Sequence, residues 1–160
     1  MKISVVVPVY KEPEMLEDIF IKVSSYDYEE KELVIVVDGN TNLAIEEVVK
    51  KVEGCRWVKV VYNNARLGKV ESLNRVVDFC DGEGIIFLDN DVELPYDVNF
   101  LKKVSYELGR YDIVEFAKEG IGINFFSKVV SYDYLGGLLL VGCLQRFLVG
   151  TYSYVVRLSL

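Results

Sequence analysis

Two aspartates separated by one residue, Asp89 and Asp91, carry the clearest chemical signal in the sequence. Both come directly after a short apolar run at residues 84–88, which has the pattern of a buried strand. Mg²⁺ and Mn²⁺ prefer oxygen ligands and commonly bind one or two protein carboxylates together with substrate phosphates. Such a metal neutralises the charge that develops on a diphosphate as it leaves. We therefore predict Asp89 and Asp91 as metal ligands, the alternative being a solvated turn with helix-capping aspartates.

Three other polar clusters contain residues that suit a nucleotide. Asp38 follows the apolar run at 33–37 and can accept a hydrogen bond from a base or ribose, or form an Asx turn. Arg66 and Lys69 lie next to a predicted helix start and suit a phosphate, although ordinary surface charge explains them as well. Tyr10 can stack on a planar base or pack on the sheet.

The composition excludes several classes of site. The chain has no histidine and three cysteines without paired spacing, so zinc sites of the Cys/His kind and Ser-His-Asp or Cys-His nucleophiles are ruled out. The net charge is −7, and we find no basic patch that would bind nucleic acid. The first residues lack the pattern of a signal peptide, so we expect a cytoplasmic location.

Strands and helices alternate along the chain. We predict strands at 3–7, 33–37, 57–62, 84–88 and 112–116, and helices at about 12–23, 41–52, 69–79 and 96–108. In the second and fourth helices the expected inward residues include Leu43, Ala44 and Val98. This alternation predicts an α/β fold with a mostly parallel central sheet and helices on both faces. Ligands of such sheets bind beyond the carboxyl ends of the strands, where the polar clusters converge.

The segment 134–150 is strongly apolar but is interrupted by Gln145 and Arg146. It falls short of the roughly 20 residues that a membrane-spanning helix needs. We expect a helix buried in the core. The other interpretation places 134–150 against a membrane or a lipid-acceptor surface, which would put the chain at the inner face of the membrane.

Taken in order, four motifs resemble the N-terminal half of a family 2 glycosyltransferase, which has the Rossmann-like GT-A fold. The resemblance covers residues 3–97. Its motifs are Val5-Val6-Val7-Pro8-Val9-Tyr10-Lys11-Glu12, Val36-Val37-Asp38-Gly39, Asn63-Asn64-Ala65-Arg66-Leu67-Gly68-Lys69 with Leu73-Asn74, and Phe87-Leu88-Asp89-Asn90-Asp91. Each motif is weak alone, but four in the family's order are specific.

The resemblance implies roles for individual residues. Those implied to bind the nucleoside diphosphate sugar are Pro8, Tyr10, Glu12, Asp38, Arg66, Lys69, Asp89 and Asn90. The implied ligands of a divalent Mg²⁺ or Mn²⁺ are Asp89 and Asp91. Residues 150–157 look like the stretch beside the family's acceptor site, which places Arg157 on the acceptor side. No catalytic base is assigned, because structural or surface roles explain Asp112, Glu115 and Asp133 more simply. The family's base would then lie beyond the last residue or be absent.

The resemblance implies an inverting, metal-dependent transfer from a UDP- or GDP-linked sugar to a hydroxyl or phosphate of a saccharide or lipid-linked acceptor, as in polyprenyl-phosphate sugar synthases. We expect one GT-A-type domain over 1–160, with a nucleotide-sugar half at 1–97 and a partial, truncated acceptor half at 98–160. One alternative is a truncated or inactive nucleotide-sugar-binding module without turnover. A sugar nucleotidyltransferase and a Rossmann dehydrogenase both lack support, because no glycine-rich loop follows the first strand.

Overall fold

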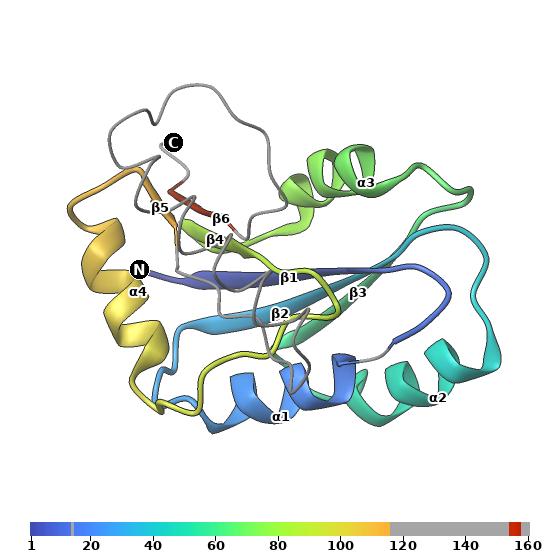
Figure 1. The fold of residues 1–160 in the computed structure, drawn as a ribbon, viewed down its shortest axis with the longest axis horizontal. Helices are drawn as coiled ribbons and strands as arrows, with labels where there is room; N and C mark the ends of the chain where they lie inside the picture. Colours follow the sequence, from blue (N-terminus) through green and yellow to red (C-terminus); the bar gives the residue numbers. More distant parts are fainter. Residues whose placement is uncertain (14, 116–153, 158–160) are drawn as a thin grey trace, which may run out of the picture. The chain divides into compact units, whose positions relative to one another are not determined.

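The structure is a computed structural model that describes residues 1–13, 15–115 and 154–157 (Figure 1). Strands and helices alternate over most of this length. The elements are β1 (Ile3–Val9), α1 (Leu16–Ser25), β2 (Lys31–Val37), α2 (Leu43–Val52), β3 (Val58–Tyr62), α3 (Lys69–Val76), the 3₁₀ turn η1 (Val77–Phe79), β4 (Gly84–Phe87), α4 (Phe100–Leu108), β5 (Ile113–Glu115) and β6 (Tyr154–Arg157).

The strands within the described residues form one six-stranded sheet in the order β3-β2-β1-β4-β6-β5. β1 pairs in parallel with β2 and β4, and β2 pairs in parallel with β3. β6 is antiparallel to β4. The prediction of an α/β fold with a mostly parallel sheet is confirmed. The sequence did not predict β6, because the short segment Tyr-Val-Val-Arg gives no indication of its partner or direction.

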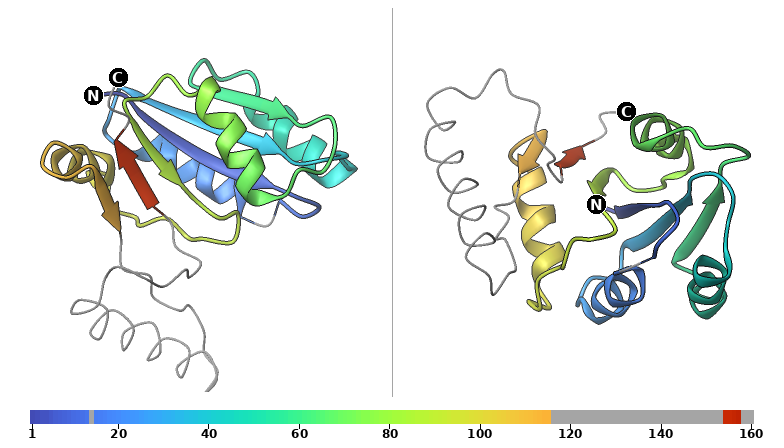
Figure 2. Two further views of the ribbon diagram at one scale, coloured as in Figure 1. Left: turned by 90° about the horizontal axis from the view of Figure 1, so that it is seen from above. Right: turned by 45° about the vertical axis from the view of Figure 1, so that its right-hand side comes forward.

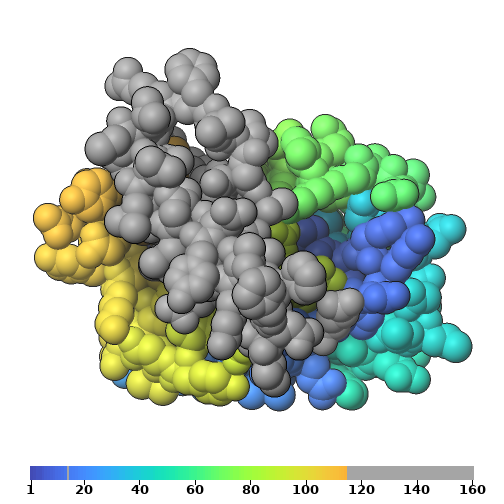
Figure 3. Space-filling model, in the orientation of Figure 1, coloured from blue at the N-terminus to red at the C-terminus, as the bar shows by residue number. Residues whose placement is uncertain are grey.

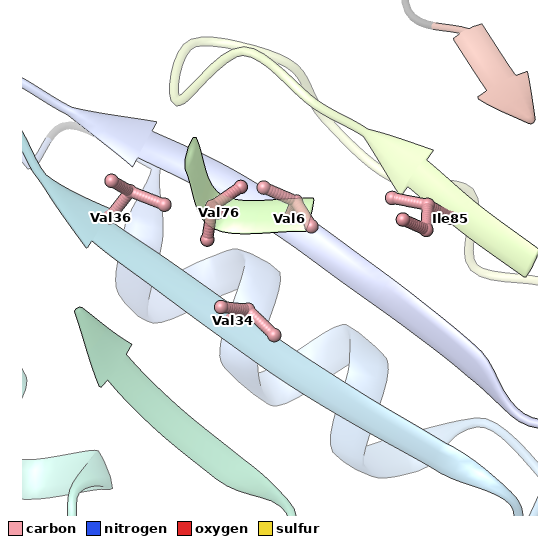
Figure 4. Close-up of a cluster of buried hydrophobic side chains, with 5 residues drawn as sticks. All are labelled: Val6, Val34, Val36, Val76 and Ile85. Carbon is pink, nitrogen blue, oxygen red and sulfur yellow. The ribbon is translucent and has the colours of Figure 1, made fainter. Parts of the chain in front are cut away.

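Helices cover both faces of the sheet, as predicted. α1 and α2 lie below the sheet in Figure 1 and α3 lies above it, and the second view in Figure 2 shows the same separation. Because both faces are covered, the parallel strands are apolar along nearly their whole length. Val76 of α3 packs against a cluster of buried sheet residues (Figure 4). The sheet members of this cluster are Val6, Val34, Val36 and Ile85.

Two helices bury different residues from those predicted. Leu43 is 78% exposed and Ala44 is also exposed, because α2 begins at Leu43 and its buried face is formed by Ile45, Val49 and Val52. The side chain of Asn42 fixes this start by accepting a hydrogen bond from the backbone N–H of Ile45 at 3.0 Å.

The fourth helix starts later than the sequence suggested. Val98 lies before α4, which begins at Phe100, and its side chain is 48% exposed. Its backbone carbonyl accepts a hydrogen bond from Asp27 at 2.9 Å, so the residue connects the helix entry to the end of α1.

β1 continues two residues beyond its predicted end and includes Pro8. The backbone N–H of Ile3 donates to the carbonyl of Glu30, and the carbonyl of Val9 accepts from the N–H of Asp38. The backbone N–H and C=O groups of the odd-numbered residues therefore point toward β2. The backbone nitrogen of Pro8 therefore points toward the β4 side of β1, where the pairing with β4 has already ended at Val6. A missing N–H donor costs nothing there.

Two expectations concern residues outside this description. The segment 134–150 and Asp133 lie outside the described residues, and the division at 97/98 stays a prediction. Among the helices that the structure describes, none has the length and apolar character to cross a bilayer.

Candidate functional site

A cavity of about 230 Å³ opens beyond the carboxyl ends of β1, β2 and β4. In the space-filling view, the residues after β1 (blue), those after β2 (turquoise) and α3 (green) adjoin on the right-hand side, where these strands end (Figure 3). The cavity is lined by Pro8, Val9, Tyr10, Asp38, Arg66, Gly68, Lys69, Asp89 and Asn90. The structure thus brings together seven of the predicted site residues from four separate segments. Glu12 and Asp91 are exposed and are not among the lining residues.

Asp38 is a buried carboxylate that organises one wall of the cavity. It is 5% exposed, and its Oδ1 accepts hydrogen bonds from the backbone N–H of Leu67 at 2.8 Å and from Asn63 Nδ2 at 3.0 Å. Its Oδ2 accepts from the backbone N–H of Gly68 at 2.9 Å. Burial alone would raise the pKa of Asp38, but these hydrogen bonds outweigh it and lower the pKa below its ordinary value. Asp38 is therefore ionised and bonded to its own chain, besides facing the cavity.

The sequence assigned no role to the side chains that support Asp38, although Asn63 opens one of the motifs. Asn63 follows β3 and is 3% exposed, and its Nδ2 also donates to the hydroxyl of the fully buried Ser72 at 2.9 Å. Arg75 donates from Nη1 to Asn63 Oδ1 at 3.2 Å. The available signal was the spacing of Ser72 and Arg75 on α3, which places both within one turn of each other.

Tyr10 and Arg66 face each other at the cavity. The guanidinium carbon of Arg66 lies 4.2 Å from the centre of the Tyr10 ring, and Lys11 Nζ lies 5.3 Å from it. Both distances are within the range of cation–π attraction. The arrangement offers a planar, cationic surface that suits a flat aromatic base.

The turn after β1 is held by two asparagines. Asn90 Nδ2 donates to the carbonyl of Glu12 and Asn42 Nδ2 donates to the carbonyl of Lys11, each at 2.5 Å. Lys11 has a φ of 66°, a left-handed conformation that non-glycine residues adopt infrequently. Glu12 thus takes part in this turn through its backbone carbonyl. Asn90 both lines the cavity and fixes the turn.

Asp89 forms an ion pair with Lys69 across the cavity. Asp89 is 22% exposed at its side chain and Lys69 is 46% exposed, so both remain open to a ligand. Among the described residues, no group of three or more His, Cys, Asp or Glu side chains could hold a metal by itself. The chemistry of the donor set, two carboxylates two residues apart, fits a hard cation whose remaining ligands are phosphate oxygens.

The segment after Asp91 is tied to α1. Lys22 is 3% exposed, and its ammonium lies 2.8 Å from Glu93 and 3.1 Å from Asp18. It also lies 4.0 Å from the centre of the Tyr96 ring. Burial opposes the charge of Lys22, but its hydrogen bonds to Glu93 and Asp18 outweigh this effect and raise its pKa. A lysine on a helix face gives no hint of this role in the sequence.

The structure does not bring the backbone of Arg157 to the cavity. Arg157 pairs with Gly84, the first residue of β4, whereas Asp89 comes after Leu88, beyond the other end of that strand. The position of Arg157 on the acceptor side, which the resemblance implied, stays a prediction.

Comparison with known proteins identifies the family. The family model described as glycosyl transferase family 2 matches residues 4–132. An uncharacterised glycosyltransferase of Synechocystis is 26% identical over 117 residues, which are 71% of this chain and 36% of the relative. One of Haemophilus influenzae is 27% identical over 137 residues, which are 81% and 55%. The chain thus spans roughly a third to a half of the length of these relatives.

Solved structures share the fold. TarS of S. aureus, residues 1–349, has a TM-score of 0.66 at 21% identity, covering 78% of this chain and 37% of that one. A mannosyltransferase of Pyrobaculum calidifontis in complex with GDP-Man and Mn²⁺ has a TM-score of 0.65 at 21% identity, covering 84% and 38%. Glucosyl-3-phosphoglycerate synthase of Mycobacterium tuberculosis in complex with UDP scores 0.61 at 22% identity, covering 98% and 56%. The fold is the Rossmann-like GT-A fold, and the chain belongs to glycosyltransferase family 2.

Proposed function

We propose that the cavity binds a nucleoside diphosphate sugar and that the chain supplies the donor site of a metal-dependent, inverting sugar transfer to an acceptor hydroxyl or phosphate. The observation that carries this proposal is the convergence of Tyr10, Arg66, Lys69 and Asp89 on one cavity at the strand ends. Similar folds whose complexes contain UDP, UDP-GlcNAc or GDP-Man support the class of ligand.

Four of the lining residues have roles that their geometry suits. The paired surface of Tyr10 and Arg66 would receive the base, and Asp38 would fix the loop that closes this wall. Lys69 would turn from Asp89 to a phosphate, because a doubly charged diphosphate attracts an ammonium more strongly than one carboxylate does.

Asp89 and Asp91 would hold Mg²⁺ or Mn²⁺ together with the diphosphate. When bound, the metal neutralises the charge of the leaving diphosphate. Similar structures contain Mn²⁺ with GDP-Man and with UDP. Both described carboxylates that line the cavity already have partners, so we assign neither of them as the base that deprotonates the acceptor.

Asp91→Ala tests the metal role, with Asp112→Asn as a control at an exposed aspartate that does not line the cavity. We expect calorimetric titration with UDP and GDP in Mn²⁺ to show at least tenfold weaker binding in Asp91→Ala, because a charge-assisted ligand contributes about 1.5–3 kcal/mol. The control should bind like the parent chain. Equal binding by Asp91→Ala and the parent would contradict the assignment of Asp91.

A nucleotide-sugar-binding module without turnover is the second candidate, favoured by the absence of an unpartnered carboxylate among the described cavity residues. Release of free sugar from UDP- or GDP-linked sugars distinguishes the two. The transferase predicts slow, Mn²⁺-dependent release, and the binding module predicts binding with no release.

A further inference from the structure

We propose that Asn63 is a positioning residue for the cavity loop, residues 66–69, and that it acts through Asp38 under the control of Arg75. This role does not require Asn63 or Arg75 to touch the ligand. The inference rests on the proposed function, because the loop it positions carries Arg66 and Lys69.

The sheet fixes the backbone of Asn63, and both hydrogens of its side-chain amide are hydrogen-bonded. Its backbone N–H donates to the carbonyl of Val37 at 2.9 Å, which extends the β2–β3 pairing by one residue. Its Nδ2 donates to Asp38 Oδ1 at 3.0 Å and to the hydroxyl of Ser72 at 2.9 Å. Because Asn63 is 3% exposed, water cannot readily replace either bond.

Arg75 determines which way the Asn63 amide points. A guanidinium only donates hydrogen bonds, and Arg75 Nη1 donates to Asn63 Oδ1 at 3.2 Å. The opposite amide orientation would set the NH₂ group against Arg75 and the carbonyl oxygen against the Asp38 carboxylate. Both contacts would be repulsive, so Arg75 keeps the NH₂ group directed at Asp38.

The Asp38 carboxylate transmits this orientation to the cavity loop. It accepts from the backbone N–H groups of Leu67 at 2.8 Å and Gly68 at 2.9 Å. Gly68 is the N-cap of α3 and has a φ of +84°, so its position decides where Lys69 begins the helix. Losing the Asn63 bond would let the carboxylate turn and release the loop.

Two variants test this chain of contacts. Asn63→Leu keeps the volume and removes both donors, and Arg75→Met changes an exposed residue of α3. In both we expect faster hydrogen exchange at the amides of Leu67 and Gly68, with no change at the buried sheet amide of Leu33. We also expect UDP and GDP, titrated in Mn²⁺, to bind about tenfold more weakly, the effect of losing one hydrogen bond to a charged group. Arg75→Lys keeps a cationic donor and should stay within about twofold of the parent.

Unchanged exchange at Leu67 and Gly68 in both variants, or unchanged nucleotide binding despite faster exchange, would overturn the inference. An effect of Asn63→Leu without any effect of Arg75→Met would overturn the part played by Arg75. If the parent chain itself binds neither nucleotide, the proposed function fails and the positioning role fails with it. If the parent binds and the variants bind equally well, only the inference fails.

Discussion

Asp38 shows how a buried charge can serve a binding site. Its carboxylate would be costly to bury without partners, but three hydrogen bonds from Leu67, Gly68 and Asn63 compensate for the lost water. The same bonds close one wall of the cavity and fix the start of α3. An acidic chain can thereby present Arg66 and Lys69 to an anionic ligand at a defined place, despite a net charge of −7.

The ion pair between Lys69 and Asp89 predicts opposite effects of a Lys69 substitution on Mn²⁺ affinity and on nucleotide affinity. In Lys69→Met, Asp89 loses its cation, so Mn²⁺ alone should bind the nucleotide-free chain more tightly. UDP and GDP should bind about tenfold more weakly, because a charge-assisted phosphate contact of about 1.5–3 kcal/mol is lost. Electron paramagnetic resonance of free Mn²⁺ measures the first effect and calorimetry the second.

Lys103→Met is the matched control, because Lys103 also pairs with an aspartate, Asp97, but is 70% exposed and does not line the cavity. It should change neither binding constant. A Lys69→Met chain with tighter nucleotide binding, or with unchanged Mn²⁺ binding, would contradict the role given to this lysine.

At the scale of elements, the junction between β2 and α2 decides how closely two loops approach. Gly39 has a φ of +91°, and a side-chain carbon built at this position would lie 3.4 Å from both Cα and Cβ of Arg66. Only glycine adopts this backbone conformation without strain, and it also leaves room for the cavity loop.

Gly39→Ala should therefore lower the free energy of unfolding by about 1–2 kcal/mol, the cost of a left-handed conformation for a residue with a side chain. Gly54→Ala is the control, since Gly54 has no positive φ and no atom within 4 Å of the added carbon. Urea unfolding of the two variants measures the difference, and equal midpoints would contradict the cost assigned to the left-handed conformation of residue 39.

Topology explains which site residues the sequence could predict. Tyr10, Asp38 and Asp89 follow strands, and parallel strands end at one edge whatever their side chains do. Asn63 and Arg75 could not be paired in advance, because their contact depends on the rotation of α3 over the sheet. Lys22 resembles any exposed helix lysine until the segment after Asp91 is placed against α1.

The helix boundaries could likewise be predicted only in part from the sequence. Leu43 was expected to be buried because it begins an apolar pattern, yet the cap at Asn42 sets the helix phase so that Ile45 is buried instead. A single apolar residue at a helix start fits either phase. β6 could not be predicted as the antiparallel neighbour of β4, because its partner lies about seventy residues earlier in the chain.

At the scale of the whole molecule, a buried carboxylate lies near each end of β2. Glu32, at its start, is 2% exposed and accepts from Ser4 Oγ at 2.5 Å and from the backbone N–H of Asp81 at 2.6 Å. Its Oε2 lies 3.0 Å from Lys59 Nζ and 3.4 Å from Lys2 Nζ. Asp38, after the last residue of β2, faces the cavity. We therefore expect stability and ligand binding to be separable between the two ends of this strand.

Glu32→Gln should destabilise the chain near neutral pH without changing nucleotide binding. Burial would raise the pKa of Glu32, but hydrogen bonding to Ser4, Lys59 and Asp81 outweighs it and lowers the pKa. The stabilisation is therefore complete above the ordinary glutamate pKa of about 4.3 and is lost as the pH falls through the lower folded pKa. The parent should exceed Glu32→Gln by about 2 kcal/mol at pH 7, the scale of charge-assisted hydrogen bonds.

Urea unfolding at pH 7 and at pH 3 measures this difference, which should shrink at the acidic pH. A difference that grows as the pH falls would contradict the direction of the pKa shift. Weaker binding of UDP or GDP by Glu32→Gln would contradict the separation of the two ends of the sheet.

The most direct test of the donor site is a thermal-shift measurement of the parent chain with UDP and with GDP, each with and without Mn²⁺. A ligand at 100 times its dissociation constant stabilises the folded state by about 2.7 kcal/mol, which raises the melting midpoint by several degrees. We predict such a rise with one of the two nucleotides, and only when Mn²⁺ is present. No rise with either nucleotide, with or without the metal, would contradict the assignment of the cavity to a nucleoside diphosphate sugar.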